Sequence, residues 1–183
     1  MPSPAARRAL AVLSVALALP ALGAEPKGPP PPSPEQRRMG WLVGKWKGTG
    51  AVKENPFMPT GTLQTSDDCA WFEGKYAVVC RGSGKGPVGP MKSIGIMGWN
   101  AEEKTYVWYG LDSTPSASTV VARGTLEGST WTFVDEQRME GKLVRSRYVM
   151  AEKGKDAYDF RWEVQGADGT WATVMEGTSR RVR

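Results

Sequence analysis

The side chains that most often carry catalysis are scarce in this sequence, and histidine is missing altogether. Without histidine, the chain cannot build a Ser-His-Asp or Cys-His nucleophile, a His-ligated haem or a His-bearing zinc site. Ligation of a haem by Tyr or Met stays open. We therefore expect no cofactor, no metal and no catalytic residue that the sequence alone can name.

Carboxylates are the remaining candidates for acid–base chemistry, because two of them can act as general acid and general base. They are scattered along the chain as Asp67-Asp68, Glu102-Glu103, Asp112, Asp135-Glu136 and Glu176. The pair at 67–68 is expected at a solvated strand edge, and the pair at 102–103 in a solvated turn. Asp112 shares the alternation of Tyr106 and Trp108, which predicts that its side chain points inward.

The two cysteines, Cys69 and Cys80, flank the turn signal Glu73-Gly74. In an exported protein the usual state of such a pair is a disulfide. If Trp71 paired with Tyr76, Cys80 would lie diagonal to Cys69, about 7 Å away and beyond the usual span. A bulge or a shifted turn would place the cysteines opposite each other. We predict a structural disulfide; two buried thiols or a redox pair are the alternatives, although the spacing is unlike Cys-x-x-Cys.

A glycine-rich run, Gly84-x-Gly86-x-x-Gly89, matches the dinucleotide-binding fingerprint by letters. Pro87 and Pro90 interrupt it, no helix follows, and Gly86 stands where a phosphate loop needs Ser or Thr. The segment from Ser83 to Pro90 is instead expected to be a mobile loop at the mouth of a barrel.

The elements that would position these residues are almost all strands. Ser33 and Pro34 predict the start of a short helix over Pro34–Leu42. Turn signals then recur every ten to fifteen residues and separate about ten segments. The clearest one is 157–165, where Tyr158, Phe160, Trp162 and Val164 alternate with charged or polar residues. The remaining predicted strands are 45–53, 62–71, 76–82, 92–100, 104–112, 118–126, 130–136, 142–152 and 170–180.

This pattern predicts an all-β fold, an antiparallel meander β-barrel with a short N-terminal helix. So many strands in one domain cannot leave long bare edges, and closure removes them. Gly44-Lys45-Trp46 at the start of the first strand, with Arg180 and Arg181 on the last, is typical of small ligand-binding barrels. We expect Trp46 to be buried at one end, with a guanidinium packed on its face.

Eight Trp and five Tyr residues are concentrated on the predicted strands. They predict either a cavity lined by aromatic side chains or a barrel that these side chains fill. If the barrel is open near Ser83–Pro90, the candidate ligand-binding residues are Trp71, Tyr106, Trp108, Asp112, Trp131 and Trp162. Asp112 would be the polar anchor.

The N-terminal region is typical of an export signal. Arg7 and Arg8 precede an apolar stretch too short to span a bilayer, and cleavage is expected after Gly23 or Ala24, which gives a signal peptide over residues 1–23. Twin-arginine export is an alternative to the general route. Residues 24–34 form a proline-rich linker, and 35–183 form the barrel domain. The mature protein is expected to be periplasmic or secreted, with no lipoprotein anchor because no cysteine follows the cleavage site.

The charge of the chain argues against a nucleic-acid partner. The formal net charge of +5 falls to +3 when the two signal arginines are removed. The remaining charges form no basic stripe, so we expect no nucleic-acid partner.

Four stretches, taken in order, resemble the uncharacterised bacterial family called domain of unknown function 1579. They are Trp41–Gly48, Gly95–Asn100 with Lys104–Tyr109, Gly124–Gly128 and Trp171–Thr178. The resemblance covers residues 35–181 and implies a lipocalin-like (calycin) barrel. It transfers no catalytic residue.

Three functions fit these features. The first is a noncatalytic protein that binds a small apolar or amphipathic ligand. The second is a structural or partner-binding protein of the cell envelope, and the third is an enzyme, such as an isomerase, that uses carboxylates or Tyr. An inward acid with a perturbed pKa in an open pocket would favour the enzyme, and a barrel filled with side chains the partner-binding protein.

Overall fold

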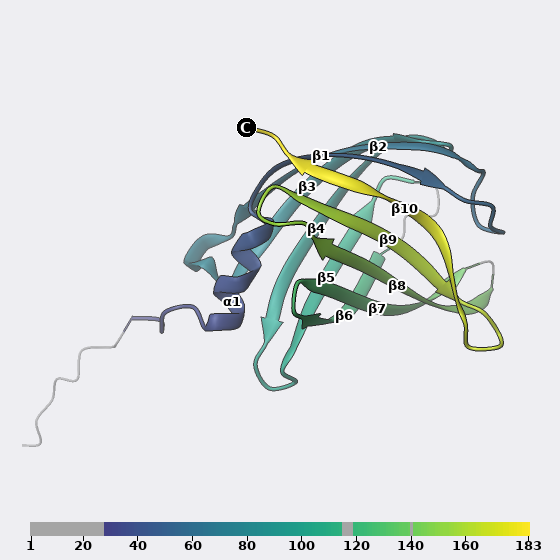
Figure 1. The fold of residues 1–183 in the computed structure, drawn as a ribbon. Coiled ribbons are helices and arrows are strands. Elements are labelled where there is room, and N and C mark those ends of the chain that lie inside the picture. The colour runs from purple at the N-terminus through teal and green to yellow at the C-terminus, as the bar shows by residue number, and fades with distance from the viewer. Residues whose placement is uncertain (1–27, 115–118, 140) are drawn as a thin grey trace, which may run out of the picture. The chain divides into compact units, whose positions relative to one another are not determined.

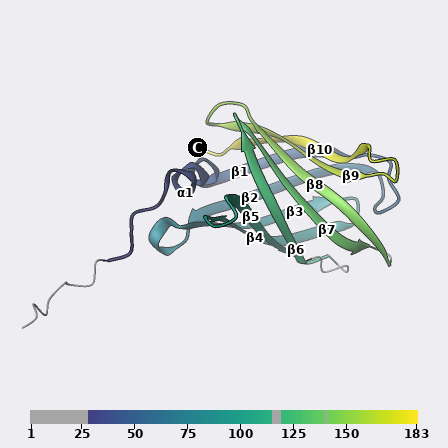
Figure 2. The same cartoon turned by 90° about the horizontal axis from the view of Figure 1, so that it is seen from below.

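The computed structural model of the protein describes residues 28–114, 119–139 and 141–183. The predicted signal peptide lies outside the described residues. Ten strands form one antiparallel ring in which each strand pairs with its neighbours in the chain, and β1 pairs with β10 to close it (Figures 1 and 2). The all-β barrel predicted from the sequence is confirmed.

A short helix precedes the strands at one end of the barrel (Figure 1). The elements in chain order are α1 (Pro34–Arg38), a 3₁₀ turn (Met39–Leu42), β1 (Gly44–Val52), β2 (Gly61–Trp71), a second 3₁₀ turn (Glu73–Lys75), β3 (Ala77–Gly86), β4 (Gly89–Asn100), β5 (Thr105–Asp112), β6 (Thr119–Glu127), β7 (Thr130–Met139), β8 (Lys142–Glu152), β9 (Ala157–Gln165) and β10 (Trp171–Arg181). None of the helices in the described part of the chain is long and apolar enough to cross a membrane.

The helix begins where the sequence predicts but ends early. Ser33 and Gln36 form a capping box: the Ser33 hydroxyl accepts a hydrogen bond from the Gln36 amide, and the Gln36 side chain accepts one from the Ser33 amide. The predicted helix over Pro34–Leu42 is divided, because the α-helix stops at Arg38 and a 3₁₀ turn carries the chain to Leu42. That tighter turn buries Met39 and Leu42 in the core.

The segment from Ser83 to Pro90 is not a loop, as the sequence suggested, but a hairpin. β3 runs to Gly86 and β4 starts at Gly89, with only Pro87 and Val88 between them. The prolines fit because they lie at or beside the turn, where fewer backbone donors are needed. Gly89 takes a φ of 102°, which only glycine adopts readily.

The turn between β2 and β3 decides how the cysteines meet. It spans more residues than a two-residue turn, with Gly74 and Lys75 both at positive φ, and the Phe72 amide donates to the Ala77 carbonyl. As a result Trp71 pairs with Val78, and Cys69 stands directly opposite Cys80. The two sulfurs form a disulfide inside the barrel, and both cysteines are buried.

Candidate functional site

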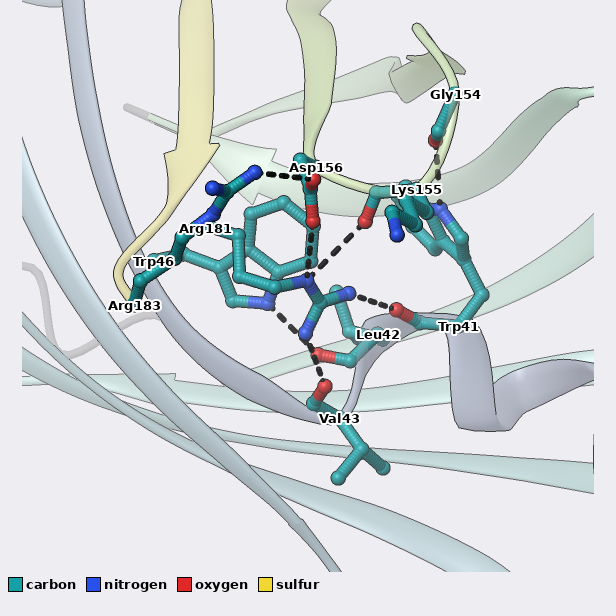
Figure 3. A network of polar contacts seen from close by, with 9 residues as sticks. All are labelled: Trp41, Leu42, Val43, Trp46, Gly154, Lys155, Asp156, Arg181 and Arg183. Atoms are coloured by element: carbon teal, nitrogen blue, oxygen red, sulfur yellow. Dashed lines mark hydrogen bonds and ion pairs between the residues drawn. The ribbon is translucent and has the colours of Figure 1, made fainter.

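One end of the barrel is closed around Trp46, which is fully buried at the start of β1. Its indole Nε1 donates to the Leu42 carbonyl at 2.8 Å, and the guanidinium of Arg181 lies 4.1 Å from the ring centroid (Figure 3). Arg181 also donates to the carbonyls of Trp41, Val43 and Lys155. Of the two arginines considered for this closure, Arg181 makes it and Arg180 is exposed.

The helix end is filled with packed aromatic rings. Trp41 contacts the rings of Trp46, Trp131 and Tyr158 at centroid distances of 5.7, 6.3 and 5.5 Å. The indole Nε1 of Trp131 donates to Glu152 at 2.6 Å. Arg38 from α1 pairs with the same carboxylate at 2.5 Å and lies over the Trp131 ring. The helix is thereby fixed as a plug at this end of the barrel.

The six candidate ligand-binding residues divide between the two ends of the barrel. Tyr106 and Trp131 are buried at the plugged end, where their rings lie 4.8 Å apart and the Tyr106 hydroxyl reaches the Glu35 carbonyl. Trp71 packs its ring over Gly40 of the first 3₁₀ turn. Trp108 and Trp162 lie farther along the barrel, where both are half-buried. Trp108 packs against Phe133 and Trp162 against Phe57, at centroid distances of 6.1 and 6.4 Å.

Asp112 lies on the inner wall at the last position of β5, opposite Ser93. Its Oδ1 accepts hydrogen bonds from the Thr114 amide at 2.8 Å and the Thr114 hydroxyl at 2.5 Å. These hydrogen bonds hold the backbone where the chain leaves β5. The carboxylate of Asp112 therefore stabilises the turn after this strand.

Glycines on the inner wall make room for the rings that fill the middle of the barrel. A Cβ on Gly95 would come within 2.1 Å of the Trp108 ring, and one on Gly124 within 2.5 Å of the Phe133 ring. A Cβ on Gly177 would meet the Phe160 ring at 2.5 Å. Each of these glycines therefore lets a ring approach the backbone more closely than a side chain would allow.

The inner wall also carries a carboxylate without a partner. Asp67 is on β2, two residues from the inward-facing Cys69 and opposite Trp46. Asp67 and Ser93 approach the inner face of Gly82, where a Cβ would lie 2.7 Å from Asp67 Oδ1 and 2.3 Å from Ser93 Oγ. No hydrogen bond or ion pair within the described ranges reaches this carboxylate. Burial without compensation raises the pKa of Asp67 to about 6.

Three hydroxyl groups belong to the same interior. Tyr148 on β8 and Tyr158 on β9 both lie close enough to Asp67 for its charge to raise their pKa values further. Burial is the larger cause for both, and it raises the pKa of Tyr158 to about 12. Ser179 on β10 is 1% exposed and pairs with Tyr158 across the sheet, where its hydroxyl lowers the pKa of Tyr158 against the larger effect of burial. A Cβ on Gly48 would lie 3.6 Å from that hydroxyl and 2.4 Å from the Thr65 hydroxyl.

Asp135 is a second buried acid, but its charge is compensated. It accepts hydrogen bonds from the Ser146 hydroxyl at 2.6 Å and the Gln137 amide at 3.1 Å. Burial still raises the pKa of Asp135, while these hydrogen bonds oppose the shift. Asp135 is therefore part of a satisfied network, unlike Asp67.

Accessible surface remains on the inner wall beyond the plug. Although Tyr148 lies deep enough for burial to raise its pKa well above the usual value, its side chain is only half-buried by surface area. The two observations agree if its exposed surface faces an interior space and not bulk water. Other inward side chains in this part are likewise half-buried: Thr65, Asp67, Ser93, Trp108, Trp162 and Met175. We call the space they bound the lumen.

Two further hollows lie away from the lumen. One, of about 360 Å³, is on the outer wall and is lined by Val121, Arg123, Val134, Asp135, Glu136 and Arg145. The other, of about 410 Å³, borders Glu35, Lys104, Tyr106 and the end of β6 at the plugged end. Neither includes Asp67 or the hydroxyl groups near it. Among the residues with described positions, no three His, Cys, Asp or Glu side chains gather as a metal site.

Comparison with known proteins identifies the family. A sequence profile described as "Protein of unknown function (DUF1579)" matches residues 31–181. The chain belongs to this family. No curated protein matches the sequence.

Solved structures show that the fold of this DUF1579 member is shared with distant barrels. Rv2717c from M. tuberculosis is similar with a TM-score of 0.57 at 14% identity, over 83% of this chain and 99% of that one. The S-type phycobiliprotein lyase CPES from Guillardia theta is similar with a TM-score of 0.51 at 13% identity, over 81% and 93%. At such identity these likenesses describe the fold alone.

Sequence reasoning missed the central residue of the lumen. Asp67 was expected at a solvated strand edge, and this was wrong because β2 is paired on both sides. The signal was present in the alternation: if Cys69 points inward to form a disulfide, so must Asp67. Alternation likewise places Tyr148 and Ser179 on the inner faces of their strands, but the neighbours of each depend on strands that meet only when the ring closes.

Proposed function

We propose that this protein is exported, binds a small apolar or amphipathic ligand in the lumen of its barrel, and does not transform that ligand chemically. The observation that carries the proposal is an inner wall on which two indole rings and a carboxylate, Asp67, are only half-buried, with no charge or donor that compensates the burial of Asp67 among the described residues. Pockets for small molecules commonly combine apolar walls with a few polar groups of this kind. The disulfide between Cys69 and Cys80 supports an oxidising compartment.

The first test asks whether the lumen is the binding site. N-phenyl-1-naphthylamine, a neutral apolar dye whose fluorescence rises in dry surroundings, should bind saturably with one site per chain. Ser93→Phe would place a ring in the lumen beside Asp67, and Ile94→Phe would add the same ring on the outer wall, where Ile94 is 37% exposed. We expect the first variant to lose dye binding and the second to keep it.

Circular dichroism and a cooperative melting transition must show that both variants fold. The proposal fails if the unmodified protein does not bind the dye, or if Ser93→Phe binds it as tightly as Ile94→Phe. Native mass spectrometry of protein taken from its own envelope would then identify what the lumen carries.

A partner-binding role is the second candidate, because the outer wall carries a contiguous apolar patch. Ile94 pairs with Leu111, Ile96 with Tyr109, and Tyr109 with Val121 across β4, β5 and β6. All five side chains are 37–50% exposed. Contiguous exposed apolar side chains often mark an interaction surface. Tyr109→Lys should break a complex cross-linked in the envelope if this role holds, while leaving dye binding unchanged.

An enzymatic role is supported by the single observation that Asp67 has a raised pKa of about 6. Such an acid can exchange protons near neutral pH, and the neutral tyrosine hydroxyls could stabilise a developing oxyanion. The test is whether the ligand leaves the protein changed. Mass spectrometry of the ligand before and after incubation with catalytic amounts of protein would show a new product that Asp67→Asn abolishes.

A further inference from the structure

The unpaired carboxylate of Asp67 indicates which polar group a ligand in the lumen should carry. We propose that the lumen selects amphipathic ligands with a protonated amine, which Asp67 binds, and that it disfavours the corresponding carboxylates. This inference rests on the proposed function and names the chemical class of its ligand.

The first argument is the geometry around Asp67. An ionised carboxylate only accepts hydrogen bonds, and burial without a donor is costly. The described chain supplies none: Asp67 Oδ1 lies over Gly82, a position at which no side chain can intervene. Because the group is half-buried on the inner wall, a ligand that enters the lumen can reach it. A ligand donor would supply the missing partner.

The second argument is the set of hydroxyl groups close to the carboxylate. A primary ammonium has three N–H donors, so one carboxylate does not satisfy it. Tyr148 and Tyr158 stay neutral at physiological pH because burial raises the pKa of both phenols, and each therefore offers acceptor lone pairs. The two tyrosines lie on β8 and β9, which are reached from β2 along the ring by way of β1 and β10.

The third argument is that no free cation faces Asp67 among the residues with described positions. Within those residues, the arginines that contact interior rings, Arg38 and Arg181, both have other partners. Arg38 is paired with Glu152, and Arg181 donates to three backbone carbonyls over Trp46. A ligand carboxylate would therefore meet Asp67 with no opposing charge, a juxtaposition of like charges that costs binding energy.

The apolar part of the ligand has surfaces to contact. Trp108 and Trp162 are half-buried, so part of each ring stays accessible. An ammonium beside such ring faces gains further attraction from the aromatic quadrupole. The lumen thus offers ring faces for the hydrocarbon and oxygen atoms for the amine.

Three ligands that share a naphthalene ring test the inference by isothermal titration calorimetry at pH 7.5: 2-naphthylmethylamine, 2-naphthylmethanol and 2-naphthoate. We expect the amine to bind about tenfold more tightly than the alcohol, and the carboxylate to bind most weakly, because charge-assisted hydrogen bonds are the stronger ones. Asp67→Asn should bring the amine to the affinity of the alcohol. Asp68→Asn, the same change on the outer face of β2, should leave all three affinities unaltered.

Equal affinity for amine and carboxylate, or an unchanged order in Asp67→Asn, would overturn the inference. If none of the three binds while N-phenyl-1-naphthylamine does, the amine site is wrong and the ligand-binding proposal survives. If the dye also fails to bind, the ligand-binding proposal fails and the inference fails with it.

Discussion

The guanidinium of Arg181 stacks on the buried ring of Trp46, and β1 and β10 are joined at that point because the two residues are direct partners in the sheet. Three backbone carbonyls accept hydrogen bonds from the same guanidinium, including those of Trp41 and Val43 in the turn before β1 (Figure 3). One side chain thus links the last strand to the helix plug and to the first strand.

Removing either member of this contact should weaken the whole barrel. Trp46→Ala should lower the free energy of unfolding by about 3–5 kcal/mol as a large core truncation. Arg181→Met should lower it by about 2–4 kcal/mol, because it leaves carbonyls unpaired. Arg180→Met, a neighbouring exposed arginine, is the matched control and should change it by less than about 0.5 kcal/mol. Urea unfolding measures all three, and equal effects of the two arginine variants would contradict the role of Arg181.

The disulfide should contribute to stability and should be present in exported protein. Cys69 and Cys80 are eleven residues apart. A disulfide that closes a loop of this length lowers the conformational entropy of the unfolded chain, which raises the free energy of unfolding by about 2–3 kcal/mol. The double variant with alanine at both positions should unfold at correspondingly lower urea concentration. Mass spectrometry of unreduced, alkylated protein should find no alkylated cysteine; two alkylated cysteines would show that the disulfide does not form in the cell.

The packing of Trp108 over a bare backbone should make Gly95 sensitive to substitution. In Gly95→Ala the new methyl would overlap the indole, which must move into the lumen, and overpacking of this kind costs about 1–3 kcal/mol. The variant should also bind N-phenyl-1-naphthylamine more weakly. Gly98→Ala is the matched control on the same strand, because a Cβ there meets nothing within 4 Å. Thermal melting separates the two, and similar melting temperatures would contradict this packing.

Much of the fold could be predicted because strand alternation and turn residues are local signals. Tyr158, Phe160 and Trp162 indicate one buried face, and Trp46 with a late arginine indicates closure. The position of each ring along the barrel could not be predicted, because it depends on the tilt of the strands relative to one another. That is why Tyr106 and Trp131, expected near an open mouth, belong to the plugged end instead.

The raised pKa of Asp67 should make stability depend on pH. Between about pH 4 and pH 6 the folded protein keeps a proton on Asp67 that the unfolded chain has already released. The free energy of unfolding should therefore fall as pH rises through this window, by at most about 3 kcal/mol, and stay level above it. Asp67→Asn should be more stable than the unmodified protein at pH 7.5 and equally stable near pH 4.

Other groups on the inner wall define the controls for this experiment. Tyr148 and Tyr158 do not titrate in the window. Asp135 has a pKa raised in the same direction, so a smaller slope should remain in Asp67→Asn. Asp112 lies at the mouth with its carboxylate bound to Thr114. Asp68→Asn should keep the full slope, and a slope in Asp67→Asn as steep as in the unmodified protein would contradict the assignment.

The pairing of β1 with β10 also determines which end of the barrel would face the solution if the protein were attached to a surface by its C-terminus. Because Trp46 pairs with Arg181, the C-terminal residues leave the barrel at the plugged end, while the turn at Pro87 and Val88 lies at the opposite rim. A tag placed after Arg183 would attach the protein to a sensor chip by its closed end. The lumen would then open toward the flowing solution, so small amines could be measured on immobilised protein without steric blockage.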